Sequence, residues 1–244
     1  MMIDTHCHVD QYDDPEALAA RAESDGILTV AVTNLPRHYQ LASTNLRGFM
    51  HVRPALGLHP LAANEHEREI ELFAQLANEA PFIGEVGLDF SSTGVASRNM
   101  QVASFRKVLS ILKGKRKFVT VHSRSAEDMV LKCLSDASFG PVAFHWFSGS
   151  STMLKRIVDE GHYISINPAM IATKKWVDCF RMIPRDRVLT ETDGPFCRHA
   201  AKIAEPSTIR AVLDWIANQW LCSPKAAETI IADNFRIIPS RQGS

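Results

Sequence analysis

The stretch FIGEVGLDFSSTGVASRNMQVASFRKVLSILKGKRKFVTVH, residues 82–122, holds one complete repeat of the pattern that runs through the chain. Phe82–Leu88 and Phe118–Val121 are short apolar runs rich in β-branched residues, which is typical of buried strands. Between them, Ser97–Leu112 carries apolar residues at helical spacing, and Gly114 follows where a helix commonly ends. The stretch therefore predicts a strand, a helix and a second strand that runs parallel to the first.

The same alternation extends in both directions along the chain. We expect strands at Met2–Thr5, Ile27–Thr33, His51–Leu58, Phe82–Leu88, Phe118–Val121, Val142–Phe147, Tyr163–Ile166 and Val188–Thr190. Amphipathic stretches of helical period lie at Pro15–Ser24, Arg37–Leu46, Glu65–Asn78, Ser97–Leu112, Ala126–Leu134, Thr152–Glu160, Lys174–Met182, Thr208–Gln219 and Lys225–Asn234. About eight such units predict a single α/β domain over residues 1–244, a (β/α)8 TIM-type barrel. A doubly wound open sheet is the alternative.

Composition narrows the functional classes. The chain has 244 residues, with 27 basic and 27 acidic side chains and a formal net charge of zero. Such a balance argues against electrostatic coating of long nucleic acid, although a single strand end could still enter a local pocket. The longest uncharged run, 137–154, contains Pro141 and is shorter than the roughly 20 apolar residues of a membrane span. We expect a cytoplasmic protein with no membrane partner, because the N-terminal sequence MMIDTHCH does not resemble a signal peptide.

Ligand-type side chains gather where the predicted strands end. These residues are His6, His8, His59, Glu85, Asp89, His122, His145 and Asp193. The C-terminal ends of parallel barrel strands converge on one face, where such barrels carry their chemistry. The sequence therefore predicts that these side chains share one site.

The ligand types point to metal. In His6-Cys7-His8, an extended backbone directs both imidazoles to the barrel interior and Cys7 to the helix layer. Glu85, His122, His145 and Asp193 bring the set to four imidazoles and two carboxylates, too many for one tetrahedral ion. Two ions that share a carboxylate would fit. We expect two divalent ions, Zn, Mn or Mg, because packing alone would leave the buried charges uncompensated.

Several short motifs, in this order, resemble the TatD family of metal-dependent deoxyribonucleases. They are DTHCH (4–8), GLHP (57–60), GEVGLDF (84–90), VHSR (121–124), FHWFSGS (144–150), TETDGPF (190–196) and DNF (233–235). The resemblance spans residues 2 to about 238. The HWFSG variant and the short connections are also similar to the TatD-like component (QatD) of the Qat anti-phage defence module.

The resemblance implies a barrel of the amidohydrolase superfamily with a two-metal site. His6, His8 and Asp193 would hold one ion, His122 and His145 the other, and Glu85 would bridge them. Asp193 would also act as the general base. Residues 191 and 193 fall on the same face by parity, so we expect Glu191 to support a histidine, and we expect Asp89 to orient a ligand or cap a loop. The expected contacts to substrate phosphate are His59, Arg124, Lys174 and Arg198.

The expected function is hydrolysis of DNA phosphodiester bonds, on single strands or strand ends. The similarity to the Qat component also implies a place among the subunits of a defence complex. Glu85 stands where many related binuclear barrels have a modified lysine, which favours a nuclease. Two alternatives stay open, because a fold does not fix a function. One is an amide, lactone or phosphotriester hydrolase, and the other is a non-catalytic subunit of a defence complex.

Overall fold

A computed structural model describes residues 1–241. Eight parallel strands form one sheet in the order β1 to β8, with no reversal. The strands are β1 (Ile3–Cys7), β2 (Leu28–Val32), β3 (Val52–Leu58), β4 (Phe82–Gly87), β5 (Phe118–His122), β6 (Ala143–Phe144), β7 (Tyr163–Ile166) and β8 (Val188–Thr190). This order confirms the predicted single-domain barrel and excludes the doubly wound sheet, in which the strand order reverses.

The first and last strands meet at a seam of hydrogen bonds. The hydroxyl of Thr5 on β1 donates to the carbonyl of Thr190 on β8 over 2.9 Å. Just past β8, the amide of Asp193 donates to the carbonyl of His6, and the amide of His8 donates to the carbonyl of Gly194, each over 2.8 Å. The seam therefore fixes three of the expected ligands side by side.

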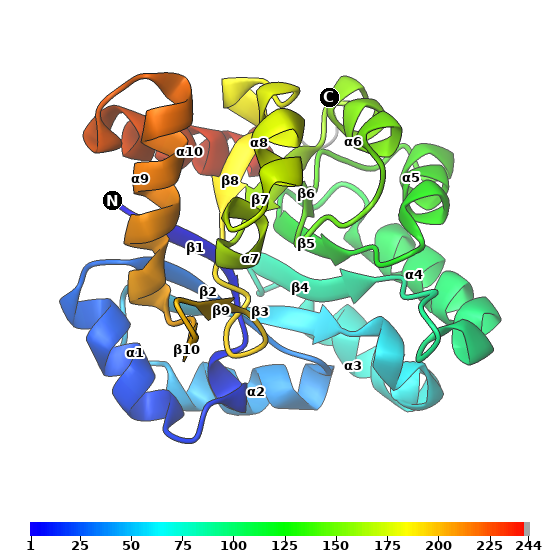
Figure 1. Ribbon diagram of the computed structural model, residues 1–244. Helices are drawn as coiled ribbons and strands as arrows, with labels where there is room; N and C mark the ends of the chain where they lie inside the picture. Colours follow the sequence, from blue (N-terminus) through cyan, green and yellow to red (C-terminus); the bar gives the residue numbers. More distant parts are fainter. Residues whose placement is uncertain (242–244) are drawn as a thin grey trace.

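Helices surround the strands, as Figure 1 shows. They are α1 (Pro15–Ser24), α2 (Pro36–Asn45), α3 (His66–Leu76), α4 (Arg98–Leu112), α5 (Glu127–Asp136), α6 (Ser151–Asp159), α7 (Pro168–Ile171), α8 (Lys174–Arg181), α9 (Ile209–Trp220) and α10 (Pro224–Arg241). The N-terminus of α1 shows why a helix begins there: Asp14 accepts the amide of Ala17 over 3.0 Å, and Pro15 occupies the first helical position.

Three features differ from the sequence prediction. Strand β6 covers only Ala143–Phe144 of the expected Val142–Phe147, because the backbone leaves the extended conformation by Trp146, whose φ is 35°. Helix α10 continues to Arg241 beyond the expected end at Asn234, because Phe235 and Ile238 are buried against the barrel. Helix α7 and a hairpin of β9 (Arg198–His199) with β10 (Lys202–Ile203) are too short to show a period in the sequence.

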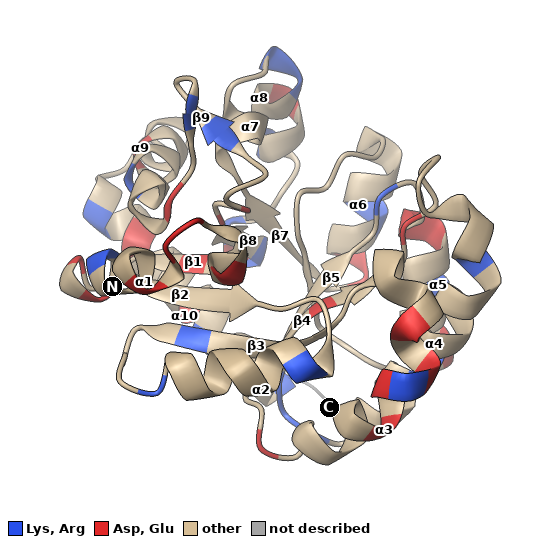
Figure 2. Ribbon diagram, turned by 90° about the horizontal axis from the view of Figure 1, so that it is seen from below, with Lys and Arg blue, Asp and Glu red and all other residues tan. Residues whose placement is uncertain are grey.

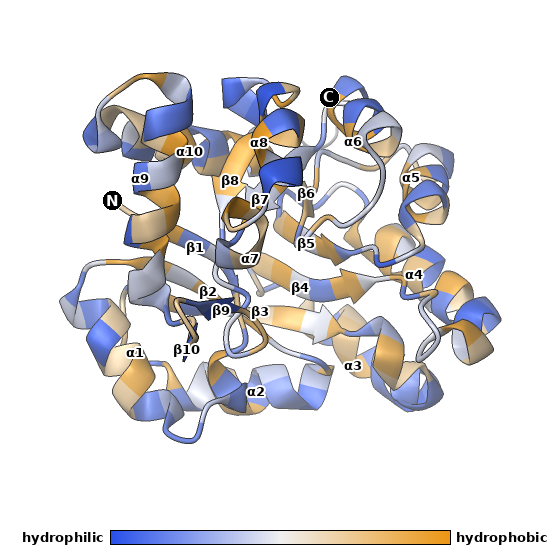
Figure 3. Cartoon of the chain, in the orientation of Figure 1, coloured by the Kyte–Doolittle hydropathy of each residue, from blue (hydrophilic) through white to orange (hydrophobic). Residues whose placement is uncertain are grey.

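Hydropathy follows the layers. In Figure 3 the strands are mostly apolar, and the surrounding helices alternate between apolar and polar residues. Figure 2 shows the charged residues mainly on the helices and connecting loops. Within residues 1–241, none of the helices combines the length and the apolar character that crossing a bilayer requires.

Candidate metal centre

The expected ligands lie together at the C-terminal mouth of the barrel. His6, Glu85 and His122 belong to β1, β4 and β5, and the others lie one to three residues beyond the end of a strand. His6, Glu85, His145, His8 and Asp193 are each no more than 6% exposed. The predicted convergence on one face is therefore present in the structure.

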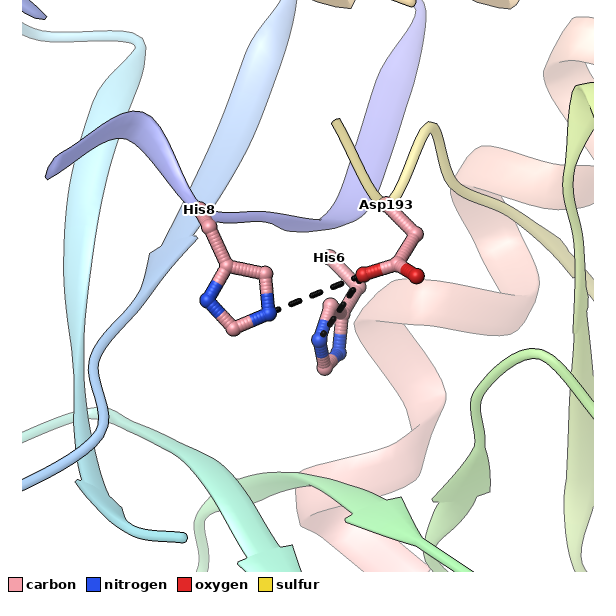
Figure 4. Close-up of side chains that lie close together, drawn as sticks. All are labelled: His6, His8 and Asp193. Atoms are coloured by element: carbon pink, nitrogen blue, oxygen red, sulfur yellow. Dashed lines mark ion pairs between the residues drawn. The ribbon is translucent and has the colours of Figure 1, made fainter. Parts of the chain in front are cut away.

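Three candidate ligands, His6, His8 and Asp193, lie together where β1 meets β8. Oδ1 of Asp193 lies 3.7 Å from Nε2 of His6 and 3.6 Å from Nε2 of His8 (Figure 4). The alternation predicted for residues 6–8 is also present, because the buried Cys7 packs in a cluster with Leu18 of α1. Asp193 has a backbone φ of 49°, a left-handed conformation that asparagine and aspartate adopt more readily than most residues.

Glu85 lies at the centre of the cluster, with its two oxygens facing different imidazoles. Oε1 lies 2.5 Å from Nδ1 of His122 and 2.7 Å from Nε2 of His145. Oε2 lies 3.2 Å from Nε2 of His8 and 3.5 Å from Nε2 of His6. This division of contacts has the arrangement expected of a carboxylate shared by two ion sites.

His59 contacts Glu85 directly, a contact that the sequence did not indicate. Its Nε2 lies 3.3 Å from Oε2 of Glu85, while its Nδ1 accepts the amide of Leu61 over 3.1 Å. Together with Glu85 and His122 it forms a third group whose ligand atoms are close enough to share an ion. The only available signal was its position, since β3 pairs with the strand that carries Glu85.

Two side chains orient the imidazoles. The hydroxyl of Thr120 lies 2.8 Å from Nδ1 of His6, which leaves Nε2 of His6 directed at the cluster. Asp89 contacts Nε2 of His122 over 2.8 Å and also accepts the amide of Ser91 over 2.9 Å. Asp89 thus contacts a candidate ligand and caps its own loop, which are the two roles the sequence suggested for it.

Glu191 does not contact a histidine among the described residues, so that prediction was wrong. Its Oε1 accepts the backbone amide of Trp146 over 2.8 Å and the side-chain amide of Asn167 over 3.1 Å. The carboxylate therefore turns toward the loops after β6 and β7, and it holds the residue that follows His145 rather than His145 itself.

Burial and neighbouring charges shift the pKa values of the cluster in opposite directions. Burial raises the pKa of Asp193 to about 8, so a carboxylate there is costly unless a cation compensates it. Burial acts the same way on Glu85, but the nearby charges of His59, His145 and His122 outweigh it and hold the pKa of Glu85 well below its ordinary value. Burial also keeps the pKa of His6 well below its usual range, which leaves the imidazole neutral and able to bind metal.

Several unpaired atoms indicate that these residues fit a cation. Nε2 of His6 and Oδ1 of Asp193 are both buried, and neither has a hydrogen-bond partner within residues 1–241. Buried polar atoms are rarely left without a partner, and a cation would satisfy a neutral imidazole nitrogen and a carboxylate oxygen together. The donor set of imidazoles and carboxylates suits a divalent transition metal.

A cavity of about 770 Å³ opens over the cluster. His59 and Arg124, two of the expected phosphate contacts, are among the residues that line it. Lys174 and Arg198 are not among them: Lys174 begins α8, and the guanidinium of Arg198 donates to the carbonyl of Ala201 over 3.0 Å in the β9–β10 hairpin. The structure thus brings together only part of the expected phosphate-binding set.

The parallel α/β barrel, with buried imidazoles and carboxylates at its C-terminal mouth, defines the class of protein: a metal-dependent hydrolase. A family model described as TatD related DNase matches residues 3–238. The chain therefore belongs to the TatD family.

Individual relatives agree with this assignment. The chain is 27% identical over 253 residues to the Escherichia coli (strain K12) protein named "Uncharacterized metal-dependent hydrolase YcfH", covering 96% of this chain and 94% of the relative. It is 28% identical over 239 residues to the Danio rerio protein named "Putative deoxyribonuclease tatdn3", covering 88% of each. The crystal structure of YJJV, a TatD homolog from Escherichia coli K12, has the same fold, with a TM-score of 0.86, 22% identity and coverage of 96% and 95%.

Proposed function

We propose that this protein hydrolyses phosphodiester bonds of DNA at the metal centre, acting on single strands or strand ends. The observation that carries the proposal is the position of Glu85, whose two oxygens separate His122 and His145 from His6 and His8. Two cations held on either side of one carboxylate suit the displacement of one phosphate oxygen by another. The deoxyribonuclease name of the Danio rerio relative supports the choice of substrate.

We infer the same ligand assignment that the sequence suggested, for two divalent ions, Zn, Mn or Mg. One ion would be held by His6, His8 and Asp193, the other by His122 and His145, with Glu85 shared. Bound cations would neutralise phosphate oxygens and make water a stronger acid. The contact of His59 with Glu85 makes it a further candidate ligand beside its expected place near the phosphate.

The protein's own groups account for positioning and proton transfer. Oδ1 of Asp193 is directed toward the cluster, where it would accept the proton of the attacking water. Thr120 and Asp89 hold the rings of His6 and His122 in place. Arg124 is exposed and lines the cavity, where its guanidinium would bind a phosphate oxygen.

The proposed substrate form rests on size and charge. The cavity over the cluster has a volume of about 770 Å³, and the chain has no net charge with which to coat a duplex. A strand end that enters the pocket would meet the cluster without a long basic surface.

Hydrolysis of an amide, lactone or phosphotriester uses the same kind of barrel and is the alternative chemistry. Membership of an anti-phage defence complex, as a catalytic or a non-catalytic subunit, also stays a prediction from the HWFSG variant. The relatives described above are named as a metal-dependent hydrolase, a putative deoxyribonuclease and a TatD homolog, and these names do not bear on that role.

The test assays purified protein with Zn, Mn or Mg against single-stranded DNA, duplex DNA and nitrophenyl esters. We expect cleavage of single-stranded DNA, and a loss of at least about 100-fold in Asp193→Asn, the size typical of a lost general base. Asp186→Asn is the matched control, because Asp186 is an exposed carboxylate two residues before β8, at the opposite end of that strand from Asp193. Ester hydrolysis without DNA cleavage, or an Asp193→Asn variant as active as the control, would overturn the proposal.

A further inference from the structure

Trp146 places an aromatic side chain on the wall of the catalytic cavity. It directly follows His145 on the loop after β6 and lines the same cavity as the metal cluster. Its side chain is partly buried and packs against the barrel core, so the indole has both a supported part and an accessible part. Such a side chain offers a rigid, flat surface beside the cluster.

The backbone at Trp146 is held in a strained conformation. Its φ is +35°, a region that a bulky side chain rarely adopts and that glycine adopts freely. The amide of Trp146 donates to the fully buried Glu191, which also accepts the side-chain amide of the fully buried Asn167. Backbone strain that buried polar groups maintain is typical of functional positions. We therefore interpret the orientation of the indole as fixed by these hydrogen bonds.

A second ring lies at the same mouth. Phe196, on the loop after β8, is 59% exposed, and its ring lies 5.0 Å from that of His8 in an edge-to-face arrangement. Phe196 also lines the cavity. Two accessible aromatic side chains thus border a cluster that is otherwise built of imidazoles and carboxylates, which suits a ligand with a flat π-face beside a charged group.

We propose that Trp146 is a stacking platform for the nucleobase of the nucleotide whose phosphate lies at the metal cluster, with Glu191 and Asn167 as its positioning residues. This inference rests on the proposed function and names the part of the DNA strand that the cavity recognises. Every base has a π-face, so a stacking platform binds strands with little regard to sequence. Phe196 borders the same space from the β8 side.

The test uses a short single-stranded oligonucleotide in which each nucleotide near either end is replaced, one at a time, by an abasic unit. For the wild-type protein, the KM for the unmodified strand should be on the order of tenfold lower than the KM for the abasic strand that shows the largest effect. This ratio is the one expected for the loss of one stacked base. Trp146→Ala should lose that preference with kcat changed less than about twofold, and Trp146→Phe should keep most of it. Leu61→Ala is the control, since it removes exposed apolar surface from the same cavity without removing a ring.

The positioning role has its own readout. Glu191→Gln keeps an oxygen that can accept the Trp146 amide and should keep the base preference, whereas Glu191→Ala should lose it through KM. Circular dichroism checks that each variant is folded. A Trp146→Ala variant with the wild-type ratio between base-bearing and abasic strands would overturn the platform.

Failure of the two proposals can be told apart by binding. If the wild-type protein cleaves no strand, the nuclease proposal is wrong. The affinity for the same strands, labelled and measured by fluorescence anisotropy, then tests whether Trp146 is a stacking platform. The platform then predicts that Trp146→Ala binds the base-bearing strand on the order of tenfold more weakly than the wild-type protein does. It also predicts that Trp146→Ala binds the base-bearing strand no more tightly than it binds the abasic strand. Equal binding by both proteins would refute the platform.

Discussion

The two ends of the barrel are built from the same strands and have opposite characters. At the N-terminal end, Phe118 of β5 packs against Phe235 and Phe82, with ring centroids 4.8 and 6.3 Å apart. Four residues later the same strand ends in His122, which contacts two carboxylates. Apolar packing at one end stabilises the fold, which allows the other end to hold buried charges that cost stability.

Two buried histidines show the same contrast. His162 precedes β7, and its Nδ1 accepts the amide of Val142 over 3.3 Å, so that this nitrogen has a partner. His6 is equally buried, but its Nε2 has no hydrogen-bond partner within the described part of the chain. Burial alone therefore does not mark a ligand. What distinguishes His6 is that its unpaired Nε2 lies 3.5 Å from Glu85 and 3.7 Å from Asp193, which are both buried carboxylates.

Removing the shared carboxylate should have the largest effect. We expect Glu85→Ala to lower hydrolysis by about 1,000-fold or more, because the ligands on both sides lose their common partner. Its melting temperature without added metal should fall, because the imidazoles whose charges hold the pKa of Glu85 down lose their partner. Hydrolysis and thermal unfolding of the same preparation check both parts. A large loss of stability with activity retained would reverse the roles assigned to the two ends.

Removing apolar surface from the opposite end should give the reverse result. Phe235→Ala should cost about 3 kcal/mol of unfolding free energy, the amount typical of a truncated core phenylalanine, while kcat of the folded protein is unchanged. Phe196→Ala is the comparison at the mouth, and it should change stability by less than about 0.5 kcal/mol because Phe196 is exposed. Urea unfolding of both variants measures the difference. Equal losses would contradict the contrast.

Lowering the pH should destabilise the protein through the buried His162. Burial lowers the pKa of His162 from 6.5 to about 4. The contribution of the neutral His162 side chain to the free energy of unfolding is therefore fully present above pH 6.5 and is lost as the pH falls toward 4. At about 1.4 kcal/mol per pKa unit, the loss is about 3 kcal/mol. His162→Gln does not titrate, and its stability should fall less over this range, as urea unfolding at each pH will show. Parallel curves for wild type and His162→Gln would refute this account.

The smallest effect should come from a residue that only orients a ligand. Thr120→Val removes the hydroxyl that contacts Nδ1 of His6, and metal affinity should fall about tenfold. Thr29→Val is the control, because the hydroxyl of the buried Thr29 on β2 donates to the carbonyl of Ile27 and contacts no histidine within residues 1–241. Titration with Mn or Zn followed by calorimetry distinguishes them. Identical affinities in the two variants would show that Thr120 has no positioning role.

The sequence predicts the barrel and the ligand cluster well, because both depend on local pattern. Apolar strands that alternate with amphipathic helices have few solutions, and a ligand at a strand's C-terminal end must lie at one mouth. The contact between His59 and Glu85 could not be predicted, since the pairing of β3 with β4 shifts its register between Leu56 and Leu58.

Loop residues were harder to place for a related reason. Strand parity places Glu191 on the same face as Asp193, but β8 ends at Thr190, so parity no longer applies. The side chain of Glu191 instead contacts the loops after β6 and β7. In the sequence, Lys174 begins the helix after the seventh strand on the catalytic face, and Arg198 lies on the loop after the last metal motif. Their position relative to the cavity depends on how α8 and the β9–β10 hairpin fold, which their composition does not indicate.

The proposed chemistry depends most on two cations that share Glu85. Metal content and calorimetric titration of the purified protein measure their binding directly. We predict two Zn or Mn ions per chain in the wild-type protein, and in Glu85→Gln at most one ion with affinity reduced at least tenfold. A wild-type protein that binds no divalent ion, or a Glu85→Gln variant that binds two as tightly as wild type, would contradict the account.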